Sequence, residues 1–362
     1  MASVGHVVCT AWAPGRVNLI GEHTDYSGGL VLPAAIQYGT SIEVSEVSDH
    51  VELVSAGYGA AVSFAADGSG EPVEGWARYA QAVAAELGEL GRPAVGLTGS
   101  VTSDLPAGAG LSSSAALEVA TALALCAVAE FEVEPLELAE ACRRAEFRAV
   151  GKPSGILDQA ASIMGREGSA ILLDCGSYEH RLVSVPSEVE LVVIDSGISH
   201  SDETAAYAAR RDEVARGLEA LGADRSTALL AEDASRLEPL LARRMRHVLS
   251  ENRRVLEFVA AVEQGELDKA GPLLYESHAS LRDDFEVSIP EIDLLVELAR
   301  DAGAYGARLV GGGFGGSILA LTDSEGAAGL VASVTQAYRE ATGRNAPALV
   351  VHPSAGAAVR RP

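Results

Sequence analysis

The sequence predicts a mixed α/β (α+β) protein built from two domains, and three observations lead to this prediction. The chain has 362 residues, enough for one large or two ordinary domains with ample cores. Short apolar strands alternate with helical patterns up to residue 195, and helices rich in Ala, Arg, Glu and Leu dominate beyond residue 200. A boundary near Pro186–Glu188 gives an N-terminal α/β domain over 1–187 and a C-terminal α/β domain over 188–362. Since no convincing linker separates them, the domains should pack closely around a site in their cleft.

The first half of the chain is expected to supply most of the strands. Residues 5–12 and 40–47 have the pattern of short strands. A helix is predicted over 76–90, because apolar residues recur on one face. The apolar run 115–131 is interrupted by polar residues, which favours a buried helix over a membrane span. The remaining elements expected up to residue 195 are a strand over 95–103, a helix over 134–147, and strands over 170–174, 181–185 and 191–195.

Beyond residue 200 the predicted elements are mostly helical. Apolar residues recur at helical spacing in four segments, 204–221, 226–264, 267–283 and 291–302. One short strand, Ser317–Thr322, is expected directly after a run of glycines. No internal repeat or low-complexity tract interrupts this pattern.

The charge balance disfavours several classes of partner. The net charge is −24, from 51 acidic and 27 basic residues. Nucleic acids and anionic membranes are bound by basic patches, so we expect neither as a partner, and protein partners are left open. The four cysteines form no CxxC pair, and the first twenty residues lack the pattern of a secretory signal peptide. We therefore expect a cytoplasmic protein with reduced thiols.

The segment LPAGAGLSSSAALE, residues 105–118, is the most informative motif in the chain. Small residues let the backbone pass close to a ligand, and a loop that opens a helix directs free N–H groups and the positive end of the helix dipole at one spot. That arrangement suits a phosphate group. The alternative is a flexible Gly/Ser turn that caps the helix with serine. The residues expected around the phosphate are Gly108, Ala109, Gly110, Leu111, Ser112, Ser113 and Ser114.

Two other phosphate-binding motifs are excluded. No GxxxxGK[ST] occurs, so the loop is not of the Walker type. GGGFGG at Gly311–Gly316 formally fits the dinucleotide pattern GxGxxG, but a strand rather than a helix is expected after it. We therefore reject a dehydrogenase and interpret these glycines as a place of close backbone approach.

The N-terminal segment Ala13–Ile36 is unusually dense in polar groups, and a second cluster lies at Lys152–Gln159. Glycine-rich loops that carry charged groups are where binding sites usually lie. The mixture of carboxylates, imidazole and amide suits a polyhydroxyl ligand such as a sugar. Taken singly, each residue also has a structural interpretation, such as a turn former, a core histidine or a helix N-terminal acid. The polar residues concerned in the first segment are Arg16, Asn18, Glu22, His23, Asp25 and Tyr26.

Together these motifs resemble those of the small-molecule kinase superfamily that includes galactokinase, homoserine kinase, mevalonate kinase and phosphomevalonate kinase. Three motifs match in the expected order: the N-terminal segment, LPAGAGLSSSAALE, and GGGFGGS near the C-terminus. Within the first, GRVNLIGEHTDYSGG is similar to the galactokinase signature, whereas relatives that phosphorylate mevalonate or homoserine lack a GEHTDY segment. The resemblance covers residues 12–322. One departure is Ser27, where many galactokinases have Asn, and it bears on fine sugar preference.

The resemblance implies a two-domain small-molecule kinase fold with the active site between the domains. It also implies transfer of the γ-phosphoryl group of ATP to the anomeric C1 hydroxyl of α-D-galactose, giving galactose 1-phosphate and ADP in galactose catabolism. Arg16 and Asp158 match the family's catalytic pair, the loop 108–114 matches its ATP phosphate site, and Ser113 and Glu146 match its Mg²⁺ ligands. The residues that match its sugar contacts are Glu22, His23, Asp25, Gly155 and Tyr207.

The chemistry of such a transfer needs few protein groups. The transition state is loose, so positioning and charge neutralisation do most of the work. A loop without lysine must neutralise phosphate through backbone amides, the helix dipole and Mg²⁺. Asp158 would orient the attacking hydroxyl and accept its proton, or only orient it, and a nearby Arg16 would favour the ionised carboxylate.

Two other functions are considered. One is a kinase for a related sugar, namely N-acetylgalactosamine, arabinose or galacturonate, which substrate profiling at C2 and C5 would separate. The other is a non-catalytic sensor that binds galactose and ATP. Sensor-type relatives have a disrupted serine loop, whereas SSSAA is intact here together with Arg16 and Asp158.

Overall fold

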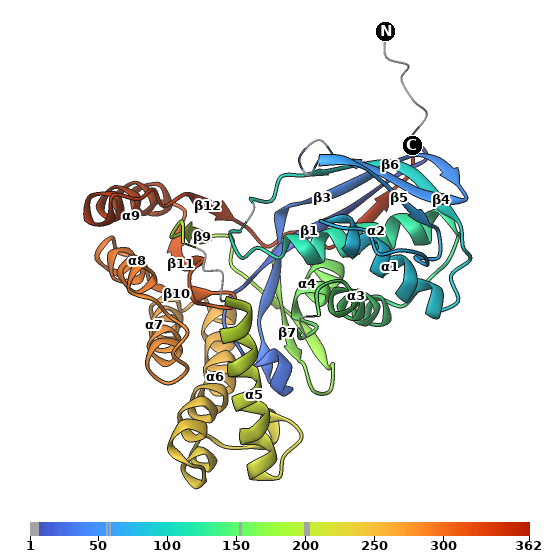
Figure 1. The fold of residues 1–362 in the computed structure, drawn as a ribbon. Helices are drawn as coiled ribbons and strands as arrows, with labels where there is room; N and C mark the ends of the chain where they lie inside the picture. The colour runs from blue at the N-terminus through green and yellow to red at the C-terminus, as the bar shows by residue number, and fades with distance from the viewer. Residues whose placement is uncertain (1–6, 56, 58, 107, 152–153, 199–202) are drawn as a thin grey trace.

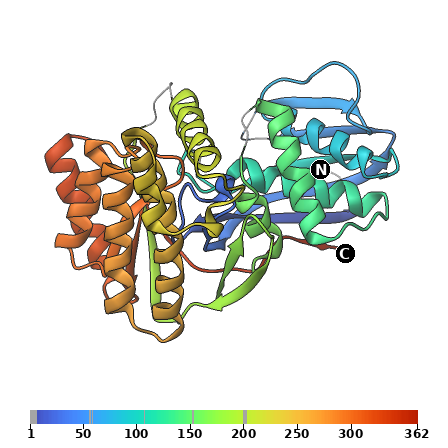
Figure 2. The same ribbon diagram turned by 90° about the horizontal axis from the view of Figure 1, so that it is seen from below.

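The computed structural model describes residues 7–55, 57, 59–106, 108–151, 154–198 and 203–362. The described elements form three sheets with helices packed against them, which confirms the predicted mixed α/β fold class (Figure 1). The N-terminal and C-terminal halves of the chain lie side by side, as the view from below shows (Figure 2).

The largest sheet belongs mainly to the N-terminal half. Its neighbouring strands pair antiparallel, except that β4 runs parallel to β6. The last strand, β13, brings the end of the chain back to the edge of this sheet beside β1 (Figure 1). In sheet order the strands are β13 (Ala358–Arg360), β1 (Cys9–Asn18), β3 (Pro33–Ser48), β6 (Gly96–Ser103), β4 (His50–Ser55) and β5 (Gly59–Ala65).

Among the described residues, four helices cover this sheet: two of them, α2 and α4, contact its strands, and the other two, α1 and α3, pack on those helices (Figure 1). Alternate apolar residues of the strands face them, and Ile42 and Val44 of β3 are fully buried in one cluster with Leu87 and Leu125 of two of the helices. Burying a side chain of this size stabilises the fold by about 1.5–3 kcal/mol. The helices are α1 (Ala77–Glu89), α2 (Ser113–Val128), α3 (Pro135–Val150) and α4 (Leu157–Met164).

In the described residues, the C-terminal half contains a four-stranded antiparallel sheet and five α-helices. In sheet order the strands are β10 (Gly306–Val310), β11 (Ser317–Asp323), β9 (Val189–Asp195) and β12 (Ala348–Val351). The helices are α5 (Glu203–Leu221), α6 (Pro239–Glu263), α7 (Leu267–Asp283), α8 (Pro290–Asp301) and α9 (Ala327–Thr342). A small third sheet, in the order β2 (Leu30–Val31), β7 (Ser169–Asp174) and β8 (His180–Ser184), adjoins α6.

One apolar cluster joins the two halves. It contains Leu19 and Ile20, which follow β1, together with Phe258 and Val259 of α6 and Leu319 of β11, all nearly inaccessible to solvent. Because the hydrophobic effect scales with the apolar area removed from water, this shared core holds the halves against each other. The close packing that the missing linker predicted is therefore present.

Two expected elements differ from the observed ones. The expected strand 5–12 overlaps β1 from Cys9 onward, and its residues 5 and 6 lie outside the described residues. The strand continues to Asn18, and a register shift between Pro14 and Arg16 accommodates the proline within the pairing with β3. The expected helix 226–264 is wrong in its first part, where two short 3-10 turns, η2 (Ser226–Ala228) and η3 (Ala231–Arg236), precede α6. The helix α6 begins only at Pro239, and the Glu238 carboxylate caps it by accepting the backbone N–H groups of Leu240 and Leu241.

The other expected elements are present, with ends displaced by a few residues. The hairpin β4–β5, the helices α4 and α9, and the strands β2, β10, β12 and β13 were not predicted. The division at residue 187 stays a prediction; it falls in the loop between β8 and β9. Among the residues described, no helix is both long and apolar enough to cross a membrane.

Candidate active site

One pocket gathers the residues that the sequence motifs singled out. Its volume is about 130 Å³, and residues from both halves of the chain line it. Both members of the expected catalytic pair, all the expected sugar contacts and the expected metal ligand Glu146 surround this one cavity. The lining residues are Arg16, Glu22, His23, Asp25, Glu146, Ser154, Gly155, Leu157, Asp158, Tyr207, Gly311 and Gly312.

The Asp158 carboxylate is held on both oxygens. Arg16 Nε donates to Oδ1 at 2.6 Å, and the Ser112 hydroxyl donates to Oδ2 at 2.6 Å. Asp158 lies in the first turn of α4, at the positive end of the helix dipole. Burial lowers the pKa of Arg16, but the charge of Asp158, with smaller contributions from Glu22 and Asp25, raises it above its usual value overall. The pair is therefore an ion pair in a fixed geometry.

The Gly/Ser loop packs directly against this ion pair. Arg16 Nη1 donates to the Gly110 carbonyl at 2.7 Å, and the backbone N–H of Arg16 donates to the Leu111 carbonyl at 3.1 Å. Gly108 and Gly110 have φ values of 79° and 72°, a backbone region that glycine adopts readily. Ser112 adopts the same left-handed region, with φ of 57°, and α2 begins at the next residue. The first turn of α2 is thus directed toward the site.

The loop is also tied to the run of glycines from the third motif. The Ser317 hydroxyl donates to the Ala109 carbonyl at 3.0 Å, and Gly311 N–H donates to Glu22 Oε1 at 2.8 Å. Arg308, fully buried in β10, donates to Glu22 Oε1 at 3.4 Å and to the carbonyl of Leu19 at 2.8 Å. Through Ser317 and Gly311, the third motif therefore connects the phosphate-type loop with the N-terminal polar segment.

Aromatic rings form one side of the pocket. The His23 ring lies 4.7 Å from that of Phe285 and 5.5 Å from that of Tyr207, and His23 Nδ1 is 2.9 Å from the Tyr26 hydroxyl. Tyr207 comes from α5 in the C-terminal half, and burial raises its pKa well above the usual value, so its hydroxyl stays protonated. Apolar ring faces with polar edges are the surfaces that commonly orient a small ligand in its pocket.

Asp25 and Gly155 touch across the pocket. A Cβ atom added to Gly155 would lie 2.1 Å from Asp25 Oδ2, so only glycine fits at this position. Burial, and next the charge of Asp158, raise the pKa of Asp25 to about 6. Asp25 begins the short turn η1 (Asp25–Ser27), which Gly28 closes with φ of 63°.

Glu146 of α3 is embedded in hydrogen bonds that sequence reasoning missed. The Ser154 hydroxyl donates to its Oε2 at 2.6 Å, the Gln159 side chain donates to the same oxygen at 3.3 Å, and the Ser114 hydroxyl is 3.4 Å from Oε1. Gln159 also donates to Glu118, whose pKa burial and the nearby Glu146 raise well above its usual value. Ser154 and Gln159 lie in the second polar cluster of the sequence, and membership of that cluster is the signal that could have identified them.

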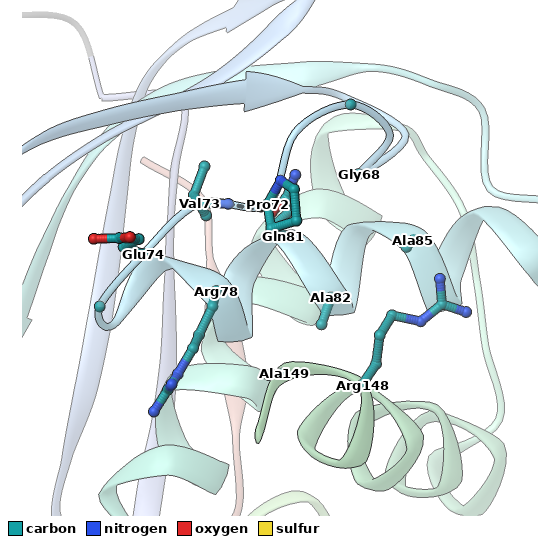
Figure 3. A pocket seen from close by; sticks show the side chains of 12 residues that line it. Gly68, Pro72, Val73, Glu74, Arg78, Gln81, Ala82, Ala85, Arg148 and Ala149 are labelled. Carbon is teal, nitrogen blue, oxygen red and sulfur yellow. Dashed lines mark hydrogen bonds between the residues drawn. The ribbon is translucent and has the colours of Figure 1, made fainter. Parts of the chain in front are cut away.

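A second, larger pocket of about 670 Å³ is also lined in part by α3. It is enclosed by the loop 68–75, one side of α1 and the C-terminal end of α3 (Figure 3). Arg148 and Ala149 line it, within one helical turn of Glu146, which lines the first pocket. The two pockets are therefore adjacent along α3.

Comparison with known proteins places this arrangement in a family. The model described as the GHMP kinases N terminal domain matches residues 77–166, the galactokinase galactose-binding signature matches residues 3–46, and the GHMP kinases C terminal model matches residues 258–340. A galactokinase of Roseiflexus sp. is 40% identical, covering 97% of this chain and 92% of that protein. A galactokinase of Thermococcus kodakarensis is 38% identical, covering 96% of this chain and 99% of that protein.

Solved structures agree with the sequence comparisons. The crystal structure of Lactococcus lactis galactokinase complexed with galactose superposes with a TM-score of 0.92 at 32% identity, covering 97% of this chain and 95% of that one. The mevalonate kinase of Methanococcus jannaschii superposes with a TM-score of 0.70 at 18% identity, over 98% of this chain and 100% of that one, and shares the fold. The chain therefore belongs to the galactokinase family of the GHMP kinases.

Proposed function

We propose that this chain is a galactokinase that transfers the γ-phosphoryl group of ATP to the C1 hydroxyl of α-D-galactose, giving galactose 1-phosphate and ADP. The observation that carries the proposal is the position of Asp158, whose carboxylate is shared by Arg16 and Ser112 at the junction of a polar pocket and a phosphate-type loop. Galactose as the substrate agrees with the galactokinase relatives and with the galactose complex of the L. lactis enzyme.

The reaction follows from where charge and protons must go. The sugar is expected between the carboxylates Glu22 and Asp25 and the rings of His23 and Tyr207, with its C1 hydroxyl against Asp158. Asp158 orients that hydroxyl and accepts its proton as the oxygen attacks the γ-phosphorus and the bond to ADP breaks. Arg16 holds the carboxylate in place through its hydrogen bond and adds positive charge beside the transferred group. A weak base suffices because a loose transition state lets the proton leave late.

Backbone groups supply most of the phosphate binding in this proposal. The loop 108–114 leads into the N-terminus of α2, where free N–H groups and the helix dipole favour an anion. Because the left-handed Ser112 sets the direction of the helix start and also contacts Asp158, the phosphate site and the catalytic carboxylate are held in one fixed geometry. Such preorganisation lowers the barrier without new bonds having to form during the reaction.

The residues near Glu146 fit a magnesium ion that arrives with the nucleotide. The carboxylate of Glu146 and the hydroxyls of the first turn of α2 are hard oxygen donors, and the 3.4 Å contact between Ser114 and Glu146 places that turn beside the carboxylate. In the part of the chain that is described, no three His, Cys, Asp or Glu side chains converge on a metal site, so phosphate oxygens and water would complete the coordination. Ser113 and Glu146 would hold the ion, which neutralises phosphate charge when bound.

The second pocket is proposed to bind the nucleoside of ATP. The two pockets take lining residues from the same turn of α3, and a nucleoside in the second pocket would direct its phosphates toward Glu146 and the loop 108–114. The substitution Ala149→Phe places a ring in the second pocket. We expect it to raise the KM for ATP about tenfold, because filling part of the pocket removes contacts with the nucleoside worth about 1.4 kcal/mol. The Kd for galactose should stay within about twofold. Steady-state kinetics and calorimetry measure the two constants, and Ala149→Ser is the matched control. Equal losses of affinity for ATP and for galactose would contradict the assignment of the second pocket to the nucleoside.

Galactose affinity is expected to rise with pH through about 6, because the pKa of Asp25 is about 6 in the free protein. An ionised carboxylate offers only acceptors and so pairs with two sugar hydroxyls, whereas the protonated acid loses acceptor capacity. The sugar therefore binds preferentially to the form that dominates above this pKa. Calorimetric titration with galactose from about pH 5 to about pH 8 measures the dependence.

Two variants sharpen this pH test. Asp25→Asn should remove the rise of galactose affinity near pH 6 and leave a weak affinity that does not change with pH. Asp158→Asn should move the rise of galactose affinity to lower pH, because the charge of Asp158 helps to raise the pKa of Asp25. A wild-type Kd that is constant across the range would show that Asp25 does not bind the sugar as an anion.

The experiment that tests the function is ADP release from MgATP with galactose, with related sugars or with no sugar. Strong release with galactose establishes the kinase and ranks its substrates. Greater release with N-acetylgalactosamine, arabinose or galacturonate would move the assignment to that sugar. Binding of galactose without any release would indicate the sensor.

We also propose that the protein is cytoplasmic and acts without nucleic acid or membrane. The four cysteines are buried and unbonded, which agrees with a reducing compartment. The division into domains 1–187 and 188–362 is kept as a proposal, with the addition that β13 at the C-terminus completes the edge of the N-terminal sheet.

A further inference from the structure

A buried side-chain network connects the three helices that bear the proposed catalytic and metal-binding groups. Gln159 of α4 is fully inaccessible to solvent, and its amide nitrogen donates to Glu118 Oε2 of α2 at 3.0 Å and to Glu146 Oε2 of α3 at 3.3 Å. Gln159 directly follows Asp158, and Glu118 lies on the helix that Ser113 begins. One carboxamide thus bridges α2, α3 and α4 in the interior.

This network is costly to bury. Within the described part of the chain, Glu118 Oε1 and Gln159 Oε1 are buried without a hydrogen-bond partner. An unsatisfied buried polar atom costs about 1–3 kcal/mol, and apolar residues of similar size would fill the same space without that cost. A contribution to stability therefore does not explain why these polar side chains occupy the interior, whereas a requirement to orient Glu146 does.

The hydrogen bonds fix the rotation of the Glu146 carboxylate. Its Oε2 accepts from both Gln159 and Ser154, so that oxygen is directed into the interior and toward the loop before α4. Its Oε1 then faces the first turn of α2, where the Ser114 hydroxyl lies at 3.4 Å. Without Gln159 the carboxylate could turn about its terminal bond, because such torsions are broad and nearly two-fold.

We propose that Gln159, anchored by Glu118, is a positioning residue that directs Glu146 toward the phosphate-binding turn and thereby sets the affinity for the metal–nucleotide complex. The inference rests on the proposed function, because it takes Glu146 as a metal ligand. Neither Gln159 nor Glu118 touches substrate in this proposal. Both act through the geometry of Glu146.

The test measures metal binding separately from turnover. Gln159→Met keeps the length of the side chain but removes both donated hydrogen bonds. We expect it to weaken binding of Mn²⁺ in the presence of ADP about tenfold, measured by the loss of the free-ion electron paramagnetic resonance signal. The Mg²⁺ concentration that gives half-maximal activity should rise by a similar factor, while the Kd for galactose should stay within about twofold.

Substitutions at Glu118 and a remote control complete the design. Glu118→Gln keeps an acceptor oxygen for Gln159 and should bind Mn²⁺ with ADP as the wild type does, whereas Glu118→Leu should resemble Gln159→Met. Tyr338→Phe, which removes a buried hydrogen bond to the Ser196 carbonyl in the C-terminal half, should lower the melting temperature without changing Mn²⁺ affinity.

Unchanged Mn²⁺ affinity in Gln159→Met would overturn the inference, as would equal losses of metal and galactose affinity. Equal damage from Glu118→Gln and Glu118→Leu would do the same. Failure of the proposed function would be a separate result. In that case the wild-type protein itself would release no ADP when galactose is added.

Discussion

Replacing Asp158 with Asn is expected to lower kcat about a thousandfold while the Kd for galactose stays within about threefold, because loss of a general base typically costs about 10²–10⁴ in rate. Asn has nearly the same shape as Asp. Its carbonyl oxygen can still accept from Arg16 Nε, which lies 2.6 Å from the native oxygen, while its amide can donate to the Ser112 hydroxyl. The geometry of the site is therefore kept, and only the capacity to accept a proton is lost.

Coupled ADP release gives kcat for this variant, and calorimetry gives its galactose affinity. The matched control is Asp323→Asn, which alters a carboxylate that accepts the Gly326 N–H in an exposed turn and does not line the pocket. That substitution should leave both constants unchanged. A decrease in kcat of less than about tenfold for Asp158→Asn would show that the carboxylate only orients the hydroxyl.

The sequence predicted which residues form the site better than it predicted how they are arranged. The density of polar residues identified the N-terminal segment, and the glycines identified the loop 108–114, without any knowledge of the fold. The contact between Arg16 and Asp158 joins residues 142 positions apart, and local periodicity carries no information on such a pairing. Only the family resemblance brought them together, and the roles it implies for them stay predictions.

Other features depend on details that a pattern of residue types does not contain. The place of Ser112 in the phosphate loop stays a prediction, but the motif did not reveal that its left-handed backbone directs the hydroxyl to Asp158. Gln159 was noted only as part of a polar cluster, because its importance comes from burial between three helices. The helix α9 went unpredicted although Leu330, Val334 and Tyr338 recur at the helical spacing that identified the other helices.

Gly155→Ala is expected to weaken galactose binding about a hundredfold, equivalent to about 2.8 kcal/mol. The added Cβ would lie 2.1 Å from Asp25 Oδ2, 2.5 Å from its Cγ and 2.7 Å from its Cβ. Rotation of the carboxylate relieves the first two contacts but not the third, because the Cβ atom of Asp25 is fixed to the backbone. Either the turn η1 or the segment before α4 must move, and both line the sugar pocket.

A matched glycine and a double-variant cycle separate this cause from general damage. Gly329→Ala in α9 places a Cβ where nothing lies within 4 Å, so it should leave galactose binding unchanged and stabilise the helix by about 0.5–1 kcal/mol. In an Asp25→Gly background the atoms that clash are gone. The loss of unfolding free energy caused by Gly155→Ala, measured with urea, should then largely disappear, because contacting residues are not additive. An equal loss in both backgrounds would locate the strain elsewhere than at the contact between Gly155 and Asp25.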